Sequence, residues 1–582
     1  MNMFAKQGSL PRLPLPTLEQ TCGKLLGWSR VFLSDSECRQ TMEAVENFRS
    51  AEGAGPTLQH YLQDLADDPA EENWLEPLWT GSYLRNPSSL PLGSNVAYLL
   101  EKPSGTKQMS LPEYMASLIT AVFDFNALIV NETLDIDHQG SVPLCMSQYQ
   151  TLLSTTRIPG ESEDTYAMKP DTTHVVIIHR GHYYRLDALD ENRHQLSPGG
   201  LLQAIQSILA APKTVNPLAV GSLTTLPRKE WASLRNHLAS LSPDNARGLE
   251  QIETALAVFV VDEPYTLSES KKFKRLLVGD SWNRWYDKSL QFILGESGEW
   301  GINYEHSGVD GTTLGHVISY LFRQMGPFDS SPGIGEIPPV SEIHFALDDY
   351  LKSAIARACE ISENEANHLT LEVMAFDAFG KDQIKRLGFS PDSFVQIGLQ
   401  LAQKRALGKA FNAYESVMTK QFLRGRTETM RPVTRESLDF VENPTYERLK
   451  AASLKHVARI TECKNGQGID RHLFGLKTMH QKQFPETPLP DLFSSPGYQA
   501  ITTNWFSTST SNVEGMRYAG YGPSVHDGFA FRYQFLPDRL HFFFSCHRHM
   551  SDDMDRLKTA MIQSMEQMKR LACHEHENEM VG

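Results

Sequence analysis

The spacing of apolar residues predicts amphipathic helices along much of this chain. Apolar side chains recur every three or four positions after residue 306, at Leu314, Val317, Ile318, Leu321 and Phe322. This spacing gathers them on one helical face, which we expect to pack against a core. A long helix is predicted to begin at Ser390-Pro391-Asp392, because Ser caps a helix, Pro fits its first turn and Asp complements its dipole.

Alternation of apolar and polar positions predicts strands elsewhere in the chain. We expect a hairpin over 173–186, a single strand over 369–376, and a second hairpin from strands 529–535 and 540–544. Helices and strands mixed over 582 residues indicate an α/β protein with more than one domain. We place a domain boundary near residue 347.

Composition narrows the classes of function. The net charge of −15 argues against a general nucleic-acid binder, which usually carries a basic face. Seven scattered cysteines without C-x-x-C spacing favour free thiols in a reducing compartment. The chain contains neither an uninterrupted apolar run of about 18 residues nor a basic region followed by an apolar one at its start. We therefore expect a cytoplasmic protein without a membrane span.

The segment 303–311 contains the first candidate chemistry. It places His306 four residues before Asp310, with glycines on either side of Val309 and Asp310. An imidazole can take a proton from an alcohol near pH 7, and a carboxylate bonded to its other nitrogen fixes the tautomer. The glycines allow a ligand to approach the backbone closely. The plain alternative is a histidine in a turn beside a solvated aspartate.

Two lysines, Lys381 and Lys385, form a second candidate. Lysines four apart lie on one helical face or along one loop edge, where both ammonium groups can bind a phosphate. A solvated basic face is the more common outcome for such a pattern. Three bases between Lys381 and Arg386 are nevertheless notable in a chain of this acidity.

Hydroxyl and arginine side chains supply two further candidates. The hydroxyl-rich stretch 502–511 either bonds its own backbone or donates to a developing oxyanion. Because no G-x-S-x-G motif surrounds it, we prefer a donor to a nucleophile. Segments 414–416, 425–431 and 468–472 combine arginine with tyrosine and threonine hydroxyls, the groups that bind a carboxylate. Spacing alone leaves this carboxylate site undecided.

Two histidine-rich segments contain residue types that bind metals. These are Cys546-His547-Arg548-His549 and Cys573-His574-Glu575-His576-Glu577. The one nearer the C-terminus is typical of a frayed polar tail. We therefore expect no bound metal.

Taken together, the four candidate segments resemble the carnitine/choline acyltransferase family. The resemblance covers essentially the whole chain and takes in these segments in the family's order. It also includes Leu10-Pro11-Arg12-Leu13-Pro14-Leu15-Pro16, Glu72-Asn73-Trp74-Leu75, Arg157-Ile158-Pro159-Gly160 and Asn283-Arg284-Trp285-Tyr286-Asp287-Lys288.

The resemblance implies an α/β fold of two similar domains, each like chloramphenicol acetyltransferase, with an active-site tunnel at their interface. We assign residues 66–347 to the catalytic-histidine domain. Residues 1–65 plus 348–582 would form the second domain, which carries the CoA and carnitine motifs. Acyl-CoA and carnitine would be small-molecule substrates of a monomer, with CoA as a co-substrate and no permanently bound cofactor.

The resemblance also implies a role for each candidate residue. The catalytic residues would be the base His306, its orienting acid Asp310 and the oxyanion donor Ser509. Those that bind CoA would be Lys381, Lys385 and Asp392. Carnitine would be bound by Tyr414, Thr427, Arg471 and Ser507, and the acyl pocket would be lined by Ala519 and Gly520. Glu428 departs from the family's usual aspartate but retains the charge.

The expected reaction is reversible acyl transfer between coenzyme A and the carnitine hydroxyl, without a covalent acyl-enzyme. Choline acetyltransferases have an asparagine in place of Arg471, since a buried arginine without a carboxylate would be an unpaired charge. Ala519 replaces the methionine that plugs the pocket of short-chain members, which favours medium-chain acyl groups, although Tyr518 can refill the space. The alternatives are a choline O-acyltransferase, a catalytically silent acyl-CoA-binding protein, and transfer to another carboxylate-bearing acceptor.

Overall fold

Two large sheets organise the protein in the computed structural model, which describes residues 2–581 except 191, 212–213, 297 and 327–336. The eight-stranded sheet has the order β11 (Val340–Ile343), β7 (His182–Asp187), β6 (His174–His179), β8 (Val258–Asp262), β9 (Leu290–Gly295), β10 (Trp300–Tyr304), β1 (Val96–Leu100) and β16 (Met516–Gly520). The six-stranded sheet has the order β12 (Leu369–Phe376), β18 (Leu540–His547), β17 (Phe529–Phe535), β15 (Phe506–Thr510), β13 (Ala413–Met418) and β14 (Thr427–Met430). The predicted mixed α/β class is confirmed.

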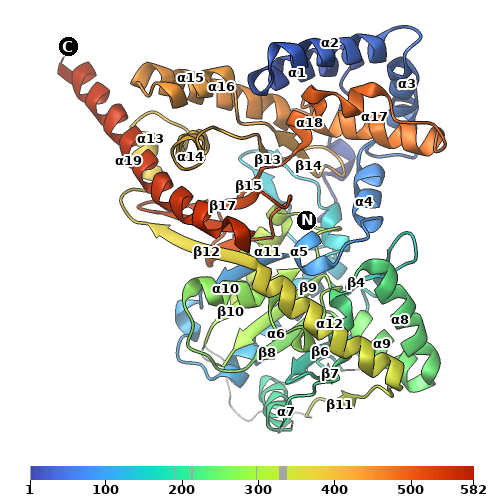
Figure 1. Cartoon of the computed structure of the whole chain (residues 1–582). Helices are drawn as coiled ribbons and strands as arrows, with labels where there is room; N and C mark the ends of the chain where they lie inside the picture. The colour runs from blue at the N-terminus through green and yellow to red at the C-terminus, as the bar shows by residue number, and fades with distance from the viewer. Residues whose placement is uncertain (1, 191, 212–213, 297, 327–336, 582) are drawn as a thin grey trace.

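Helices cover both faces of the eight-stranded sheet, which forms the lower half of Figure 1. One face packs against α6 (Leu111–Val130), α7 (Pro198–Ala210) and α11 (Gly311–Gln324). The other packs against α8 (Arg228–Leu241), α9 (Pro243–Glu253), α10 (Glu269–Val278) and α12 (Asp349–His368). Burial on both faces explains why β1 and β6 are almost continuously apolar rather than alternating.

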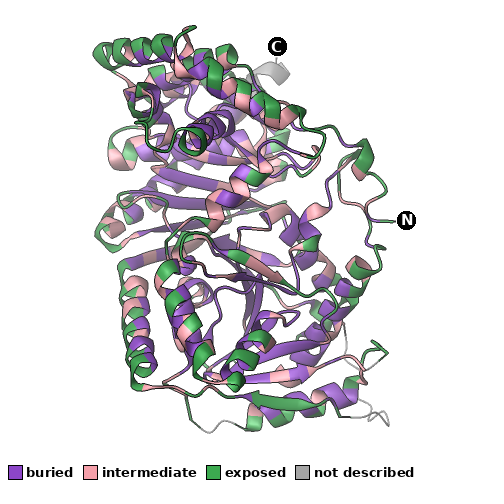
Figure 2. Ribbon diagram, turned by 90° about the vertical axis from the view of Figure 1, so that its right-hand side faces the viewer, coloured by how far each residue is buried: buried purple, intermediate pink, exposed green. Residues whose placement is uncertain are grey.

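The six-stranded sheet has its own helical layer, on the face turned away from the eight-stranded sheet. It consists of α13 (Lys381–Arg386), α14 (Pro391–Leu407), α15 (Arg435–Glu442), α16 (Tyr446–Lys464) and α19 (Ser551–Val581). A fourth core joins α1 (Leu18–Ser29), α2 (Asp35–Arg49), α3 (Ala54–Asp67), α4 (Glu76–Leu84), α17 (Asp470–Gln483) and α18 (Pro496–Thr502). Figure 2 shows purple strands of both sheets enclosed by helices with green outward faces.

Shorter elements connect these layers. They are α5 (Leu90–Gly93) and the two-stranded pairs β2 (His138–Gln139) with β3 (Val142–Pro143) and β4 (Thr155–Ile158) with β5 (Thr165–Met168).

The predicted local elements form where the periodicity placed them. The helix after His306 is α11, and its predicted apolar positions are buried except for Phe322, which is partly buried. The hairpins are β6–β7 and β17–β18, and the strand over 369–376 is β12. The predicted side-chain cap at Ser390 is wrong: α14 begins at Pro391, but no capping bond comes from the Ser390 hydroxyl, and the Ser393 hydroxyl donates to the Ser390 carbonyl instead.

One strand crosses the predicted division of the chain. β16 belongs to the 348–582 segment, yet it pairs antiparallel with β1 at the edge of the eight-stranded sheet. This pairing joins the 348–582 segment to the sheet whose strand β10 leads into His306. The division at residue 347 stays a prediction, and α12 begins just after it, at Asp349.

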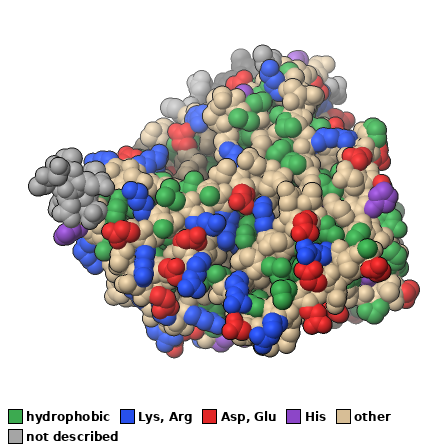
Figure 3. Space-filling view, turned by 90° about the horizontal axis from the view of Figure 1, so that it is seen from above, with side chains coloured by type: hydrophobic (Ala, Val, Ile, Leu, Met, Phe, Trp, Pro, Cys, Tyr) green, Lys and Arg blue, Asp and Glu red, His purple; other side chains and the backbone are tan. Residues whose placement is uncertain are grey.

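Within the described residues, one helix is long and apolar enough to cross a membrane. This helix is α6, and 56% of its apolar window is buried inside the fold. We interpret it as a core helix because its side chains pack between the eight-stranded sheet, α7 and α11. On the face seen in Figure 3, basic and acidic side chains are interspersed rather than separated by sign.

Candidate active site

Buried ion pairs fix the loop between β10 and α11. Glu305 accepts a hydrogen bond from Arg157 Nη1 at 3.0 Å and from the Ser94 hydroxyl at 2.8 Å. The Ser307 hydroxyl and its backbone N–H also donate to Glu305. Arg157 bonds Asp164 at 2.7 Å, and all three charged groups are nearly inaccessible to water. The loop is therefore held on both sides of His306.

The His306 ring is oriented by a backbone carbonyl. Its Nδ1 lies 2.6 Å from the Val309 carbonyl oxygen and 3.4 Å from the Tyr304 hydroxyl. We assign the proton to Nδ1 because a carbonyl can only accept, which leaves the Nε2 lone pair available as a base. The predicted direct bond to Asp310 is wrong, since Asp310 Oδ1 lies 3.9 Å from Nδ1. The Val309 carbonyl occupies the position expected for the carboxylate.

Asp310 acts on the ring through its charge. Its carboxylate accepts hydrogen bonds from Arg426 Nε at 2.8 Å and from Gln148 Nε2 at 2.7 Å. Burial alone would raise the pKa of Asp310, but Arg426 outweighs it and holds that pKa below its ordinary value. The anion therefore persists at neutral pH and stabilises an imidazolium nearby. Arg426 directly precedes Thr427 in a segment already singled out, whereas no pattern in the sequence pointed to Gln148.

Burial lowers the pKa of His306 below its ordinary 6.5, although the Asp310 carboxylate and the Val309 carbonyl oppose this shift. The side chain keeps 27% exposure, so the ring is sheltered but not sealed. A sheltered imidazole that stays neutral at pH 7 suits a general base.

Strand alternation in β15 divides its hydroxyl groups between two faces. Thr508 faces α14, where its hydroxyl accepts a hydrogen bond from Gln396 at 2.8 Å. Ser507 and Ser509 therefore face the opposite side, together with their strand partners Tyr414 and Arg532.

Tyrosines connect this face of the six-stranded sheet to the histidine. Arg532 Nη2 donates to the Tyr98 hydroxyl at 2.9 Å, and the Tyr98 and Tyr304 rings lie 6.0 Å apart between centroids. The Tyr304 hydroxyl in turn lies 3.4 Å from His306 Nδ1. Ser509 thus belongs to the face of the sheet that is turned toward His306.

Three of the four predicted carnitine residues come together around the Arg471 guanidinium. Arg471 Nη2 lies 3.2 Å from the Tyr414 hydroxyl and 3.1 Å from the Thr427 hydroxyl. The guanidinium carbon sits 3.7 Å from the centroid of the Trp79 ring. Arg471 is only 5% exposed, and among the described residues no carboxylate oxygen lies within 4.0 Å of its guanidinium nitrogens.

The predicted CoA residues separate into two environments. Lys381 is partly exposed and Lys385 exposed on α13, whose first N–H bonds the Leu536 carbonyl at the β17–β18 turn. Asp392 instead faces inward and accepts hydrogen bonds from the Tyr533 hydroxyl at 2.8 Å and from His456 Nε2 at 3.2 Å. Glu415 lies beside it, and burial raises the pKa of Glu415 well above its ordinary value.

The two predicted acyl-pocket residues point to opposite faces of the eight-stranded sheet. Ala519 pairs with Tyr98 and belongs to the core that contains Val309 and Leu314. Gly520 pairs with Ala97 on the other face, where the Phe543 ring leaves no room for a Cβ atom. Only Ala519 lies on the side of the sheet that carries the His306 loop, so the grouping of both residues in one pocket is wrong.

Comparisons with known proteins show the family of this chain. Residues 13–563 match the model of the choline/carnitine O-acyltransferase family. Carnitine O-acetyltransferase of Homo sapiens is 30% identical, over 94% of this chain and 91% of that protein. Peroxisomal carnitine O-octanoyltransferase of Bos taurus is 31% identical, over 92% of this chain and 92% of that protein. Choline O-acetyltransferase of Sus scrofa is 29% identical, over 97% of this chain and 93% of that protein. The chain belongs to the choline/carnitine O-acyltransferase family.

Membership makes the protein an O-acyltransferase that uses carnitine or choline. Among solved structures, the first condensation domain of the CDA synthetase is similar over 86% of this chain and 94% of that one, at 10% identity and a TM-score of 0.39. A TM-score this low supports no assignment.

We predict that His306→Ala lowers kcat by about 10²–10⁴-fold, the usual contribution of a positioned base. In the unaltered enzyme kcat/KM should fall on the acid side as His306 becomes protonated. Because its pKa is lowered, that fall should be centred below pH 6.5, and the variant should lose it. Both kcat and the pH dependence of kcat/KM are measured by following release of the CoA thiol. His344→Ala, at an exposed histidine, is the control, and near-normal turnover by His306→Ala would exclude this base.

Proposed function

We propose that this protein transfers acyl groups reversibly between coenzyme A and the hydroxyl of carnitine. The environment of Arg471 is the observation that carries this choice of acceptor. Its buried guanidinium donates to neutral oxygens only, and a buried cation without an anionic partner is costly. The carboxylate of carnitine would supply the missing charge. Choline has no carboxylate and would leave Arg471 unpaired.

The proposed mechanism is direct transfer by general-base catalysis. His306 Nε2 takes the proton from the carnitine hydroxyl, and the resulting alkoxide attacks the thioester carbonyl. Ser509 and the trimethylammonium group of carnitine stabilise the oxyanion of the tetrahedral intermediate. As the intermediate collapses, the C–S bond breaks and His306 returns the proton to the CoA sulfur. No covalent acyl-enzyme forms, and the reverse reaction uses the same groups.

We propose that the two substrates reach His306 from opposite sides, through a tunnel between the domains. The Lys381–Lys385 pair would bind a CoA phosphate on one side, and Arg471 with Tyr414 would bind the carnitine carboxylate on the other. Holding both reactants at one base replaces a bimolecular encounter by a near-unimolecular step. A silent acyl-CoA-binding protein would need neither the neutral His306 nor the anion Asp310 that steadies it.

Arg471→Gln should raise KM for carnitine by about 10- to 100-fold, because a charge-assisted hydrogen bond contributes about 1.5–3 kcal/mol. KM for acyl-CoA should stay nearly unchanged, since its phosphates bind elsewhere. Steady-state kinetics with carnitine and choline as alternative acceptors measure both effects. Arg435→Gln is the matched control, because Arg435 is exposed on α15. Efficient choline turnover by the unaltered enzyme, together with an unchanged carnitine KM in the variant, would favour choline as the acceptor.

The double change Lys381→Ala, Lys385→Ala should raise KM for acyl-CoA by about fivefold or more, since exposed ion pairs contribute up to about 1 kcal/mol each. Acyl-pantetheine has no phosphate, so its KM should be the same for both proteins. Lys352→Ala, at a lysine exposed on α12, is the control. An equal rise for acyl-pantetheine would mean that the lysines do not bind a phosphate.

Ala519→Met should reduce kcat/KM for octanoyl-CoA relative to acetyl-CoA. We expect a relative loss of about 10- to 200-fold, the range by which a pocket discriminates on small differences in apolar bulk. An acyl-CoA chain-length series, followed by thiol release, measures it. Ala451→Met, at an exposed position of α16, should leave the series unchanged. A uniform loss for all chain lengths would argue against Ala519 as a pocket residue.

A further inference from the structure

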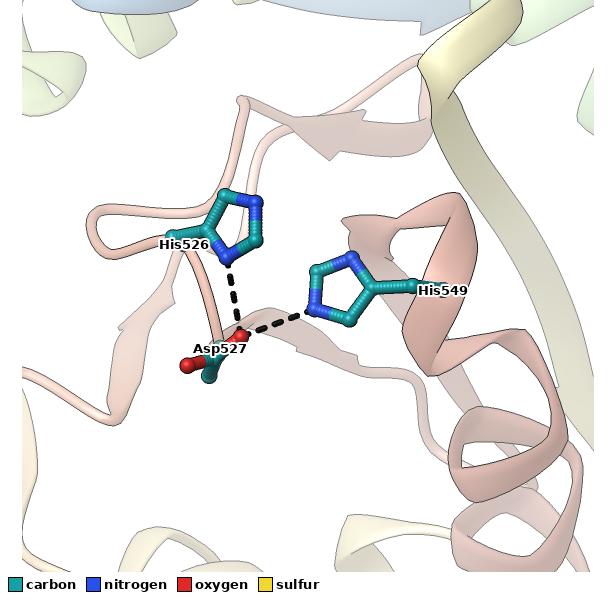
Figure 4. A group of neighbouring side chains, drawn as sticks. All are labelled: His526, Asp527 and His549. Carbon is teal, nitrogen blue, oxygen red and sulfur yellow. Dashed lines mark hydrogen bonds and ion pairs between the residues drawn. The ribbon is translucent and has the colours of Figure 1, made fainter.

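Two histidines and an aspartate converge on the surface, away from the residues assigned to acyl transfer. Figure 4 shows His526 and Asp527 on the loop between β16 and β17, and His549 on the short helix η8 (Arg548–Met550) after β18. Asp527 Oδ1 lies 2.9 Å from His526 Nδ1 and 2.8 Å from His549 Nε2. One ligand atom from each of the three residues lies within 4.8 Å of the other two.

Separate backbone anchors position the three side chains. In the loop, the Gly528 N–H bonds the Val525 carbonyl, and the next N–H, of Phe529, bonds the Trp505 carbonyl at 2.8 Å. His549 lies two residues after the end of β18, which pairs with every residue of β17. The donors thus come from two segments that the six-stranded sheet holds beside each other.

Several imidazole rings stack beside the single Asp527 carboxylate. The His526 and His549 rings stack at 4.4 Å, and His547 stacks on His526 at 5.3 Å between centroids. Two imidazoles and a carboxylate are the donor set of an open zinc site, which water completes.

We propose that His526, Asp527 and His549 bind a Zn²⁺ ion, which ties the β16–β17 loop to the junction of β18 and α19. His526 binds through Nδ1 and His549 through Nε2, each with its proton on the other ring nitrogen. Phe529, which follows this loop, pairs with Phe506 beside Ser507, so the ion stabilises the start of the strand that carries the proposed oxyanion donor.

A second convergent group does not suit a metal. Asp392, Glu415 and His456 also bring their donor atoms within 4.8 Å. However, the Tyr533 hydroxyl and His456 already donate to Asp392. Burial raises the pKa of Glu415 well above its ordinary value, which favours its protonated form, and a protonated carboxyl is a poor ligand.

The test is calorimetric titration of the full-length chain, stripped of metal by a chelator, with ZnCl₂ at neutral pH. We expect one ion per chain and a higher Tm with zinc, because a ligand that binds the folded state stabilises it. His526→Ala and His549→Ala should each weaken binding at least about tenfold and abolish the rise in Tm. Below pH 6 the affinity of the unaltered chain should fall, since imidazole must be neutral to bind.

His60→Ala is the matched control, because His60 is an exposed histidine with a single aspartate neighbour, and it should bind zinc as the unaltered chain does. All the altered side chains are exposed, so the variants should fold, and unchanged acyl transfer verifies this. Zinc binding that persists in both cluster variants would overturn the proposal, as would a failure of the unaltered chain to saturate at millimolar zinc.

Discussion

The ion pair between Arg426 and Asp310 joins the two parts of the active site. Asp310 follows the histidine loop, whereas Arg426 immediately precedes β14 of the other sheet. Arg426 also donates to the Ser307 carbonyl at 2.8 Å, so the guanidinium holds two points of the loop just after His306. Both charges are nearly buried, and removing one partner of such a pair typically costs about 3–5 kcal/mol. The position of the base therefore depends on the contact between the two sheets.

The acceptor site depends on the same backbone segment. Thr427 follows Arg426 directly, and its hydroxyl and carbonyl both accept hydrogen bonds from Arg471. Lys420, a few residues before Arg426, donates to the Thr313 hydroxyl in α11 at 2.6 Å. The residues proposed to bind carnitine and those that orient His306 are thus fixed by one short stretch of chain. Catalysis needs the base and the acceptor to be held in fixed relative positions, because a displacement of about 1 Å between reactant and base can cost about 100-fold in rate.

Local patterns in the sequence predicted local structure well. The helix after His306 and both hairpins depend on periodicity within one segment, and each forms in place. The segments that carry Tyr414, Thr427 and Arg471 were also identified, but only the fold shows that their side chains meet. Gln148 was not predictable in this way, nor was which of Ala519 and Gly520 faces the His306 loop, although strand alternation alone places neighbouring residues on opposite faces. Both depend on β1–β16 pairing and on contacts between residues more than 100 positions apart, for which a single sequence contains no signal.

The two halves of the site differ in charge balance, and this difference bears on the acceptor. Around the base, Asp310 is paired with Arg426 before any ligand arrives. Around Arg471, Asp470 is taken by Arg431, and burial raises the pKa of Glu428 to about 7, so that a large fraction of this acid is uncharged at neutral pH. The Arg471 charge is then only partly compensated within the protein. A carboxylate-bearing acceptor would complete it and would release the electrostatic cost of burying it, whereas a cationic acceptor without a carboxylate would add a second positive charge.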